Sequence, residues 1–119
     1  MSYPFEYNDE TLWDAGYHSG RLYESLAQGA AGFLAVPSGL TPSPQGGCTV
    51  DRDVFQAFVQ RLYDLRAATS AEVLRGLTNG LLVTSLVLLN RSGGSIALNP
   101  EDATALGEAT STLARSMAS

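Results

Sequence analysis

The run from Gly80 to Leu89 constrains the fold more than any other stretch of this chain. It reads Gly-Leu-Leu-Val-Thr-Ser-Leu-Val-Leu-Leu and is apolar on every side of a helix. A helix of this kind has to be surrounded by other elements, so the run marks the centre of the fold. It is too short to span a bilayer, which takes about 20 apolar residues. The run itself carries no chemistry.

The composition fits one acidic domain. The 119 residues are 45% hydrophobic and 16% charged, with a net charge of −5, and a chain of this length buries one core. The negative balance argues against nucleic acid and against a membrane surface as partners, because both need clustered basic residues. Such sparse charge predicts that a protein partner or a second copy, as in a homodimer, covers part of the surface.

Cysteine and histidine usage limits the chemistry. Cys48 is the one cysteine and His18 the one histidine, so neither an intrachain disulfide nor a zinc site is expected. We expect no metal and no other cofactor. The N-terminal residues lack both the basic start and the apolar core of a signal peptide, which predicts a cytoplasmic protein.

Residues 4–13 predict a small β-hairpin. Phe5 and Tyr7 alternate with a glutamate, and Asn8-Asp9 fits a two-residue turn. A lone hairpin of this size is marginal, so it must pack on something larger. Residues 36–49 are rich in proline and glycine and predict a loop without regular structure, either functional or mobile.

Four helices are predicted, over about residues 15–35, 51–68, 71–91 and 100–117. In the first, Asp14 is a good N-cap, and Leu22, Leu26 and Phe33 lie on an apolar stripe that we expect to face inward. The second has a clean amphipathic face. The third contains the apolar run, and the fourth starts with Pro100 at its first position.

These elements predict a mainly α fold: a four-helix bundle-like single domain over residues 1–119 with a small N-terminal β-hairpin. The helix at 71–91 is central, and in its first half Val73, Leu74 and Leu77 are expected to face inward. If the other helices do not cover this central helix, its bare side is where a second subunit would sit.

Several segments together resemble a known family. They are Phe5–Trp13, Val36–Pro42, Val50–Val59 and Gly80–Gly94. Their order and spacing are similar to a family of small uncharacterised actinobacterial proteins, a domain of unknown function common in Streptomyces-type genomes. In that family the hairpin turn usually holds glycine and the tryptophan precedes Asn-Pro, whereas this chain departs from both patterns. The resemblance implies a bacterial protein and supplies no activity, cofactor or catalytic residue.

The best polar cluster predicted from the sequence is at the start of the first helix. Asp14, His18 and Arg21 share one face by their i, i+3 and i+4 spacing. A carboxylate one turn before a histidine would fix its tautomer and raise its basicity, and the arginine would hold an anionic group. These residues are the candidate catalytic set. The alternative is a capping aspartate, a histidine stacked on Trp13 and a solvated arginine.

Aromatic side chains crowd the first 25 residues. Trp13, Tyr17 and Tyr23 are candidate ligand-binding residues, because such a cluster can form a pocket for a hydrophobic ligand. The alternative is that these rings pack the hairpin over the end of the bundle. Cys48 follows two glycines, so a reactive thiol stays open, but the chain has no serine-hydrolase elbow and no phosphate loop.

Two classes of function follow. The first is a non-enzymatic interaction or accessory protein, such as an immunity-type or inhibitor-like protein, and the lack of a catalytic signature favours it. The second is a small cofactor-free enzyme or a hydrophobic-ligand-binding protein of a biosynthetic pathway, which would use the aromatic end that holds His18.

Overall fold

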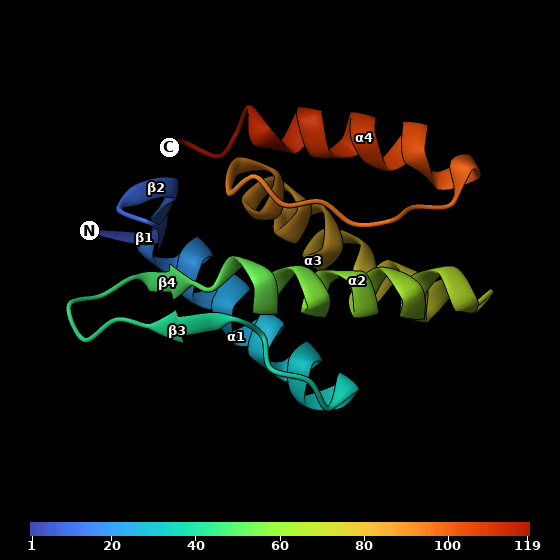
Figure 1. Ribbon diagram of the computed structural model, residues 1–119, viewed down its shortest axis with the longest axis horizontal. Helices are drawn as coiled ribbons and strands as arrows, with labels where there is room; N and C mark the ends of the chain where they lie inside the picture. The colour runs from blue at the N-terminus through green and yellow to red at the C-terminus, as the bar shows by residue number, and fades with distance from the viewer.

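The computed structural model describes all residues from Met1 to Ser119 and shows an α+β fold (Figure 1). Four strands form one mixed sheet, and four helices pack beside it. In chain order the elements are β1 (Ser2–Tyr7), β2 (Glu10–Gly16), α1 (Tyr17–Leu34), β3 (Leu40–Pro42), β4 (Cys48–Val50), α2 (Arg52–Ala68), α3 (Glu72–Arg91) and α4 (Pro100–Ala114). The prediction of a mainly α bundle with only a small hairpin is therefore wrong, because a second hairpin joins the first to make a sheet.

The first hairpin is confirmed and is longer than predicted. Asn8 and Asp9 have φ values of 49° and 65°, as a two-residue turn matched to the strand twist requires. β2 continues to Gly16, which pairs with Ser2. Asp14 therefore lies within a strand, and the predicted helix start at residue 15 with Asp14 as its cap is wrong.

The second hairpin lies in the segment predicted as a structureless loop. Thr41 pairs with Thr49 in antiparallel fashion, and Phe5 pairs with Cys48 in parallel, which gives the strand order β2-β1-β4-β3. Gly47 has a φ of 110°, and a Cβ there would come 2.7 Å from the carbonyl oxygen of Pro4. Glycine at this position thus lets β4 approach β1.

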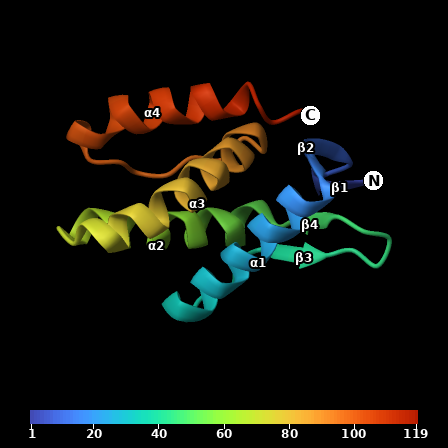
Figure 2. The same cartoon turned by 180° about the vertical axis from the view of Figure 1, so that it is seen from behind.

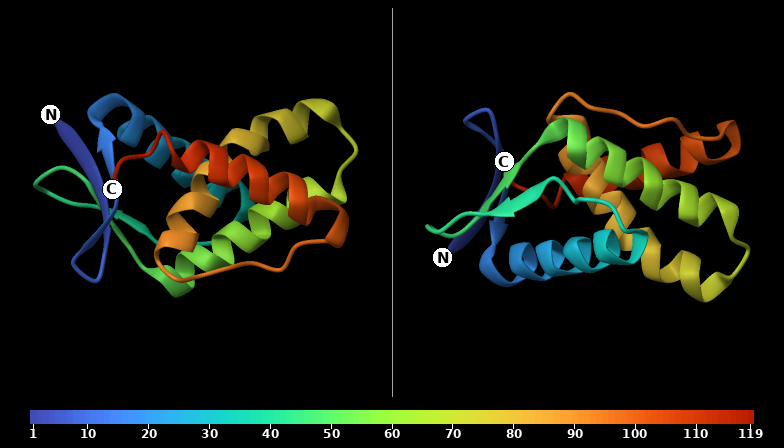
Figure 3. Two further views of the ribbon diagram at one scale, coloured as in Figure 1. Left: turned by 90° about the horizontal axis from the view of Figure 1, so that it is seen from above. Right: turned by 60° about the horizontal axis from the view of Figure 1, so that its bottom comes forward.

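The sheet lies at one end of the molecule, with both termini beside it, and the helices extend away from it (Figure 1). α4 crosses over α3 when the molecule is seen from above (Figure 3). Seen from behind, α1 and α3 lie nearest the viewer and diverge from the sheet end, with α2 beyond them (Figure 2). The back of the molecule is therefore formed by α1 and α3.

α3 occupies the centre of the helical layer, as the apolar run predicts. Between Leu82 and Leu89 every side chain but that of Thr84 is buried, against α2 on one side and α4 on the other. α3 is also long and apolar enough to cross a membrane by length and composition alone, with a mean hydropathy of 1.4 over an 18-residue window. The core helix of a soluble protein passes the same test, and 44% of this window is buried within the protein.

The orientation of α1 about its axis differs from the prediction. The buried residues are Gly20, Tyr23, Ala27 and Ala31. The predicted inward stripe instead faces outward, with Leu22 61%, Leu26 53% and Phe33 73% exposed. In the first half of α3 the prediction is wrong for Val73 and Leu77, which are 76% and 75% exposed, while Leu74 is half-buried.

The C-terminal tail is tied to the sheet. α4 ends at Ala114 rather than near residue 117, and the Arg91 guanidinium donates hydrogen bonds to the carbonyls of Leu12, Ala114 and Met117 at 2.7–3.1 Å. The Asp14 amide donates to the carbonyl of Ala118 at 2.7 Å. These bonds cover the outer edge of β2, which would otherwise offer unpaired backbone groups to another strand.

Candidate functional site

The polar cluster predicted at the start of the first helix is divided between two elements. Asp14 lies in β2 opposite Pro4, whereas His18 and Arg21 lie in the first turns of α1, and all three side chains are exposed. The Arg21 guanidinium donates to the Tyr17 hydroxyl at 3.0 Å and lies 5.5 Å from the centre of its ring. The helical spacing that linked Asp14 to His18 is absent, and a catalytic role for these residues stays a prediction.

The predicted ligand-binding aromatics lie mostly in the core. Trp13 stacks on Phe5 with ring centroids 5.2 Å apart, and Tyr23 meets both rings edge-on at 5.5 and 6.0 Å. Tyr17 is half-buried and packs against Tyr3 at 6.4 Å. These contacts hold the first hairpin against α1, while His18 meets only Tyr17, at 5.7 Å.

Tyr23 also fixes α1 to α3. Its hydroxyl lies 2.7 Å from Ser85 Oγ, which donates to the Leu81 carbonyl at 2.8 Å, so the tyrosine is the donor to the serine. Burial raises the pKa of the Tyr23 phenol well above its usual value, and the bond to Ser85 offsets only part of this. The phenol therefore stays neutral and serves as a structural hydrogen-bond donor.

An apolar groove of about 340 Å³ runs between α1 and α3. Leu22 and Leu26 form one wall, and Leu81 and Thr84 form the other. The remaining lining residues are Trp13 of β2, Ser19 and Tyr23 of α1, Gly80 of α3, Leu113 of α4, and Ser116 and Met117 of the C-terminal tail. Two of the predicted ligand-binding residues, Trp13 and Tyr23, therefore belong to this groove.

Further along the same two helices, more large apolar side chains are exposed. Phe33 lies two turns beyond Leu26 on α1, and Leu77 and Val73 lie one and two turns before Leu81 on α3, so all are on the groove side. We call this surface the α1–α3 apolar face. Its large members are exposed by 53% to 76% and are Leu22, Leu26, Phe33, Val73 and Leu77.

Glycines interrupt the same face. Gly29 and Gly32 lie between Leu26 and Phe33 on α1, and Gly76 and Gly80 flank Leu77 on α3. An added Cβ at any of these four would meet nothing within 4 Å, whereas one at Gly20 would lie 2.8 Å from the Tyr3 side chain. The fold of this chain thus requires Gly20 but gives no packing reason for the four glycines of the face.

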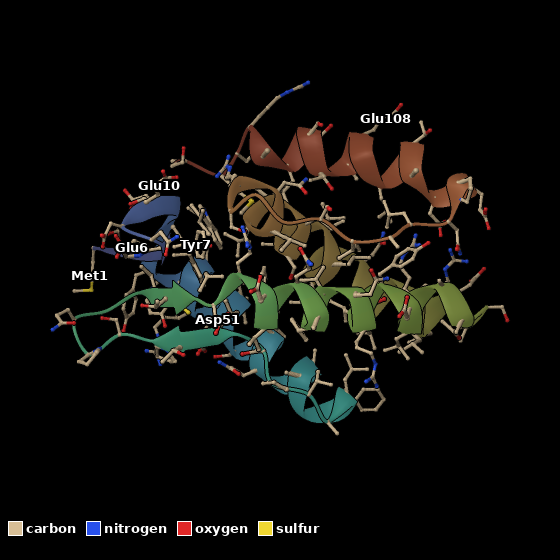
Figure 4. The ribbon with its side chains drawn as sticks, in the orientation of Figure 1. Met1, Glu6, Tyr7, Glu10, Asp51 and Glu108 are labelled. Carbon is tan, nitrogen blue, oxygen red and sulfur yellow. The ribbon has the colours of Figure 1, made fainter.

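The carboxylates of the chain lie away from the α1–α3 apolar face. The labelled carboxylates in Figure 4 lie on the first hairpin (Glu6, Glu10), at the start of α2 (Asp51) and on the outer side of α4 (Glu108). No ionisable residue is among the large side chains or the glycines of the α1–α3 apolar face. On α1 and α3 themselves, Glu24 and Glu72 lie about 100° or more around the helix from Leu22 and Val73, and the ionisable residue nearest the face is His18, one turn before Leu22. The face therefore contains no carboxylate, on a protein whose net charge is −5.

Cys48 is buried in β4 rather than exposed in a loop. It is 2% exposed, and burial raises its pKa to about 12. The thiolate, which is the reactive form, is thus nearly absent at neutral pH. No group of three His, Cys, Asp or Glu side chains is arranged to hold a metal ion.

Comparison with protein families identifies relatives of the whole chain. Residues 1–119 match the family of unknown function DUF6086. The chain belongs to this family. Membership confirms the predicted resemblance at the level of a family of unknown function, while the actinobacterial source and the cytoplasmic location stay predictions. Comparisons with curated proteins and with solved structures find no match.

The sequence contained a signal for the face that its interpretation missed. The residues Gly20, Tyr23, Ala27 and Ala31 share a helical stripe of their own, three or four positions apart. Either this stripe of small residues and Tyr23 or the leucine stripe could face the core, but not both. Four of the twelve glycines of the chain lie in the outward stripes of α1 and α3, which was a clue that these surfaces do not pack within the protomer.

Proposed function

We propose that this protein is a non-enzymatic interaction protein that binds a protein partner through the α1–α3 apolar face. One observation carries the proposal: five large apolar side chains from two adjacent helices are each more than half exposed, on an otherwise acidic molecule. Contiguous apolar patches of several hundred Å² are rare on monomers and mark interaction sites.

The energetics support an association of useful strength. Burying a whole Leu, Val or Phe side chain contributes about 1.5–3 kcal/mol. At the exposures of 53% to 76%, the five side chains together would contribute roughly 5–10 kcal/mol on full burial. Association itself costs about 4–15 kcal/mol. A partner that brings an apolar surface of its own therefore forms a stable complex with this face, whereas a polar partner does not.

Site-specific photocrosslinking in the native host tests the proposal. A benzophenone side chain placed at Leu26 or Leu77 is expected to form a covalent adduct of one defined mass after irradiation. The matched control is the same side chain at Thr104, an exposed position on α4, which is expected to give no such adduct. If positions 26 and 77 yield no adduct above the level at position 104, the proposed function is wrong.

The groove supports a second candidate function, the binding of a small hydrophobic molecule. Its volume of about 340 Å³, its leucine walls and the Trp13 and Tyr23 rings in its lining suit a ligand of one or two rings. Because Trp13 is the single tryptophan, its fluorescence reports occupancy directly. Titration with naphthalene is expected to quench this emission, and the quenching is expected to be lost in Leu81→Arg. Unchanged emission at saturating naphthalene would exclude this candidate.

A further inference from the structure

Building on the proposed function, we infer that the partner of the α1–α3 apolar face is a second copy of this chain. In this assembly α1 of each protomer packs against α3 of the other, around a two-fold axis. Such an interface is isologous, so every contact occurs twice. Three properties of the face fit this occupant.

The first property is charge. Two copies that each carry a net charge of −5 repel one another unless the surfaces that meet are uncharged. The face contains no carboxylate, because Glu24 of α1 and Glu72 of α3 lie about 100° or more around their helices from Leu22 and Val73. The acidic residues labelled in Figure 4 lie on the hairpin, just before α2 and on α4. A second copy therefore meets this face without bringing like charges together, whereas a basic partner would find no acidic group on it to bind.

The second property is area. At about 150 Å² for a large side chain, the exposed fractions of the five residues amount to roughly 500 Å² of apolar surface per protomer. With the neighbouring small residues, this approaches the value of about 800 Å² per partner that a standard stable interface buries. A second copy supplies the same apolar area from its own side, so neither surface is left facing a polar one.

The third property is shape. Each helix of the face carries both large side chains and glycines: Leu26 and Phe33 enclose Gly29 on α1, and Leu77 lies between Gly76 and Gly80 on α3. The glycines of one helix leave hollows into which the large side chains of the other fit. A face with both features on both helices is complementary to itself, which is what a two-fold contact demands.

Sedimentation equilibrium tests the inference. The wild-type chain is expected to sediment at twice its 12.6 kDa mass at high concentration and to dissociate on dilution. Leu26→Glu and Leu77→Arg are each expected to weaken self-association by about 100-fold. Thr104→Glu, on exposed α4, is the matched control and is expected to leave association unchanged. The positions tested are more than half exposed, and circular dichroism confirms that each variant folds.

Mixing the two variants tests the pairing of α1 with α3. In a mixed dimer one contact joins the new glutamate to the new arginine and the other contact is wild type, so an equimolar mixture is expected to dimerise again. A wild-type chain that stays at 12.6 kDa up to about 500 μM overturns the inference, as does a dimer that neither variant weakens.

The crosslinking experiment separates this inference from the proposed function. An adduct at twice the chain mass supports both of them. An adduct with a different protein from positions 26 and 77 overturns the second copy and leaves the proposed function standing. No adduct at either position overturns both.

Discussion

Replacing Gly76 and Gly80 by alanine is expected to stabilise the isolated protomer. Both glycines lie inside α3, where glycine costs about 0.8–1.0 kcal/mol relative to alanine. A Cβ at either position meets nothing within 4 Å, so the gain in helix propensity has no packing cost. The double variant is expected to raise the free energy of unfolding by roughly 1.5–2 kcal/mol, which raises the melting temperature by about 6–12 °C in a domain of this size.

Thermal unfolding followed by circular dichroism at low micromolar concentration measures this change on the dissociated protomer. Gly20→Ala is the contrasting control in α1. Its Cβ would lie 2.8 Å from the Tyr3 side chain and 3.0 Å from Ala15, so this variant is expected to lose about 1–3 kcal/mol. If the Gly76 and Gly80 double variant melts below the wild type, those glycines are needed within the protomer and the reasoning is refuted.

The same double variant carries a second consequence for the interface. The new methyl groups fill the hollows of the α1–α3 apolar face, so the variant is expected to self-associate at least about 10-fold more weakly than the wild type. If the protomer gains stability while the dimer weakens, these glycines serve association between protomers and not the folding of one protomer. Parallel gains in both would mean that these glycines serve no contact at all.

Three further predictions concern the interior. Tyr23→Phe is expected to lower the free energy of unfolding by about 1 kcal/mol, because it removes the buried bond to Ser85. Its control in urea denaturation is Tyr17→Phe, which removes only an exposed hydrogen bond from Arg21 and is expected to have a smaller effect. Arg91→Gln is expected to cost about 2–4 kcal/mol, because three carbonyl acceptors lose their cation, and to accelerate hydrogen exchange in the C-terminal tail. Cys48 is expected to resist alkylation at pH 8. The pKa of this thiol rises from 9.0 unfolded to about 12 folded, so between pH 9 and pH 12 unfolding releases a proton. The free energy of unfolding therefore falls as pH rises through this window, by up to about 1.4 kcal/mol per pH unit. Cys48→Ala is expected to lessen that slope in alkaline denaturation.

The parts of the fold that were predicted well rest on local signals. The turn at Asn8-Asp9, the helix from Arg52 to Ala68 and the start of α4 at Pro100 follow from backbone preferences and amphipathic periodicity within a few residues. The central position of α3 was also predicted correctly, because a helix that is apolar on every side has to be surrounded by other elements. In each case the residues that decide the structure are close together in the sequence.

The sheet was missed because its decisive contact is not local. β1 and β4 pair at Phe5 with Cys48 and at Glu6 with Thr49, more than 40 residues apart. β3 and β4 have three residues each and lie among prolines and glycines, a composition typical of loops. Short strands of this kind are stable only once the longer first hairpin supplies a neighbour, which periodicity alone does not reveal.

The candidate site was predicted in part for the same reason. Trp13 and Tyr23 do line the groove between α1 and α3, because the aromatic side chains of the first hairpin pack against α1 beside it. Asp14 was placed on the helix with His18, since the end of β2 at Gly16 depends on pairing with Ser2 rather than on local preference. The catalytic interpretation depended on a helix boundary, the least reliable feature of a sequence-based assignment.

The rotation of α1 explains why the apolar face exists at all. Turning the helix by about one residue, or 100°, would bury Leu22 and Leu26, and burial of two leucines is favourable by a few kcal/mol. The same turn would withdraw Tyr23 from Phe5 and Trp13 and break its bond to Ser85. It would also bring the Ser19 side chain to the place of Gly20, where an added Cβ would lie 2.8 Å from the Tyr3 side chain.

Those losses exceed the gain from burying the two leucines. A buried hydroxyl without a partner costs about 1–3 kcal/mol, and removal of a large aromatic ring from a core costs about 3–5 kcal/mol. Overpacking at Gly20 costs about 1–3 kcal/mol more. The aromatic cluster and the small residues beneath α1 therefore fix the rotation of this helix, and the leucines are left outside as a consequence. The features that hold α1 to the sheet are thus the ones that present the α1–α3 apolar face to a partner. A Tyr23→Ala variant, which frees the helix to turn, is accordingly expected to bind that partner less well even though Tyr23 is buried and lies beneath the surface that a partner would contact.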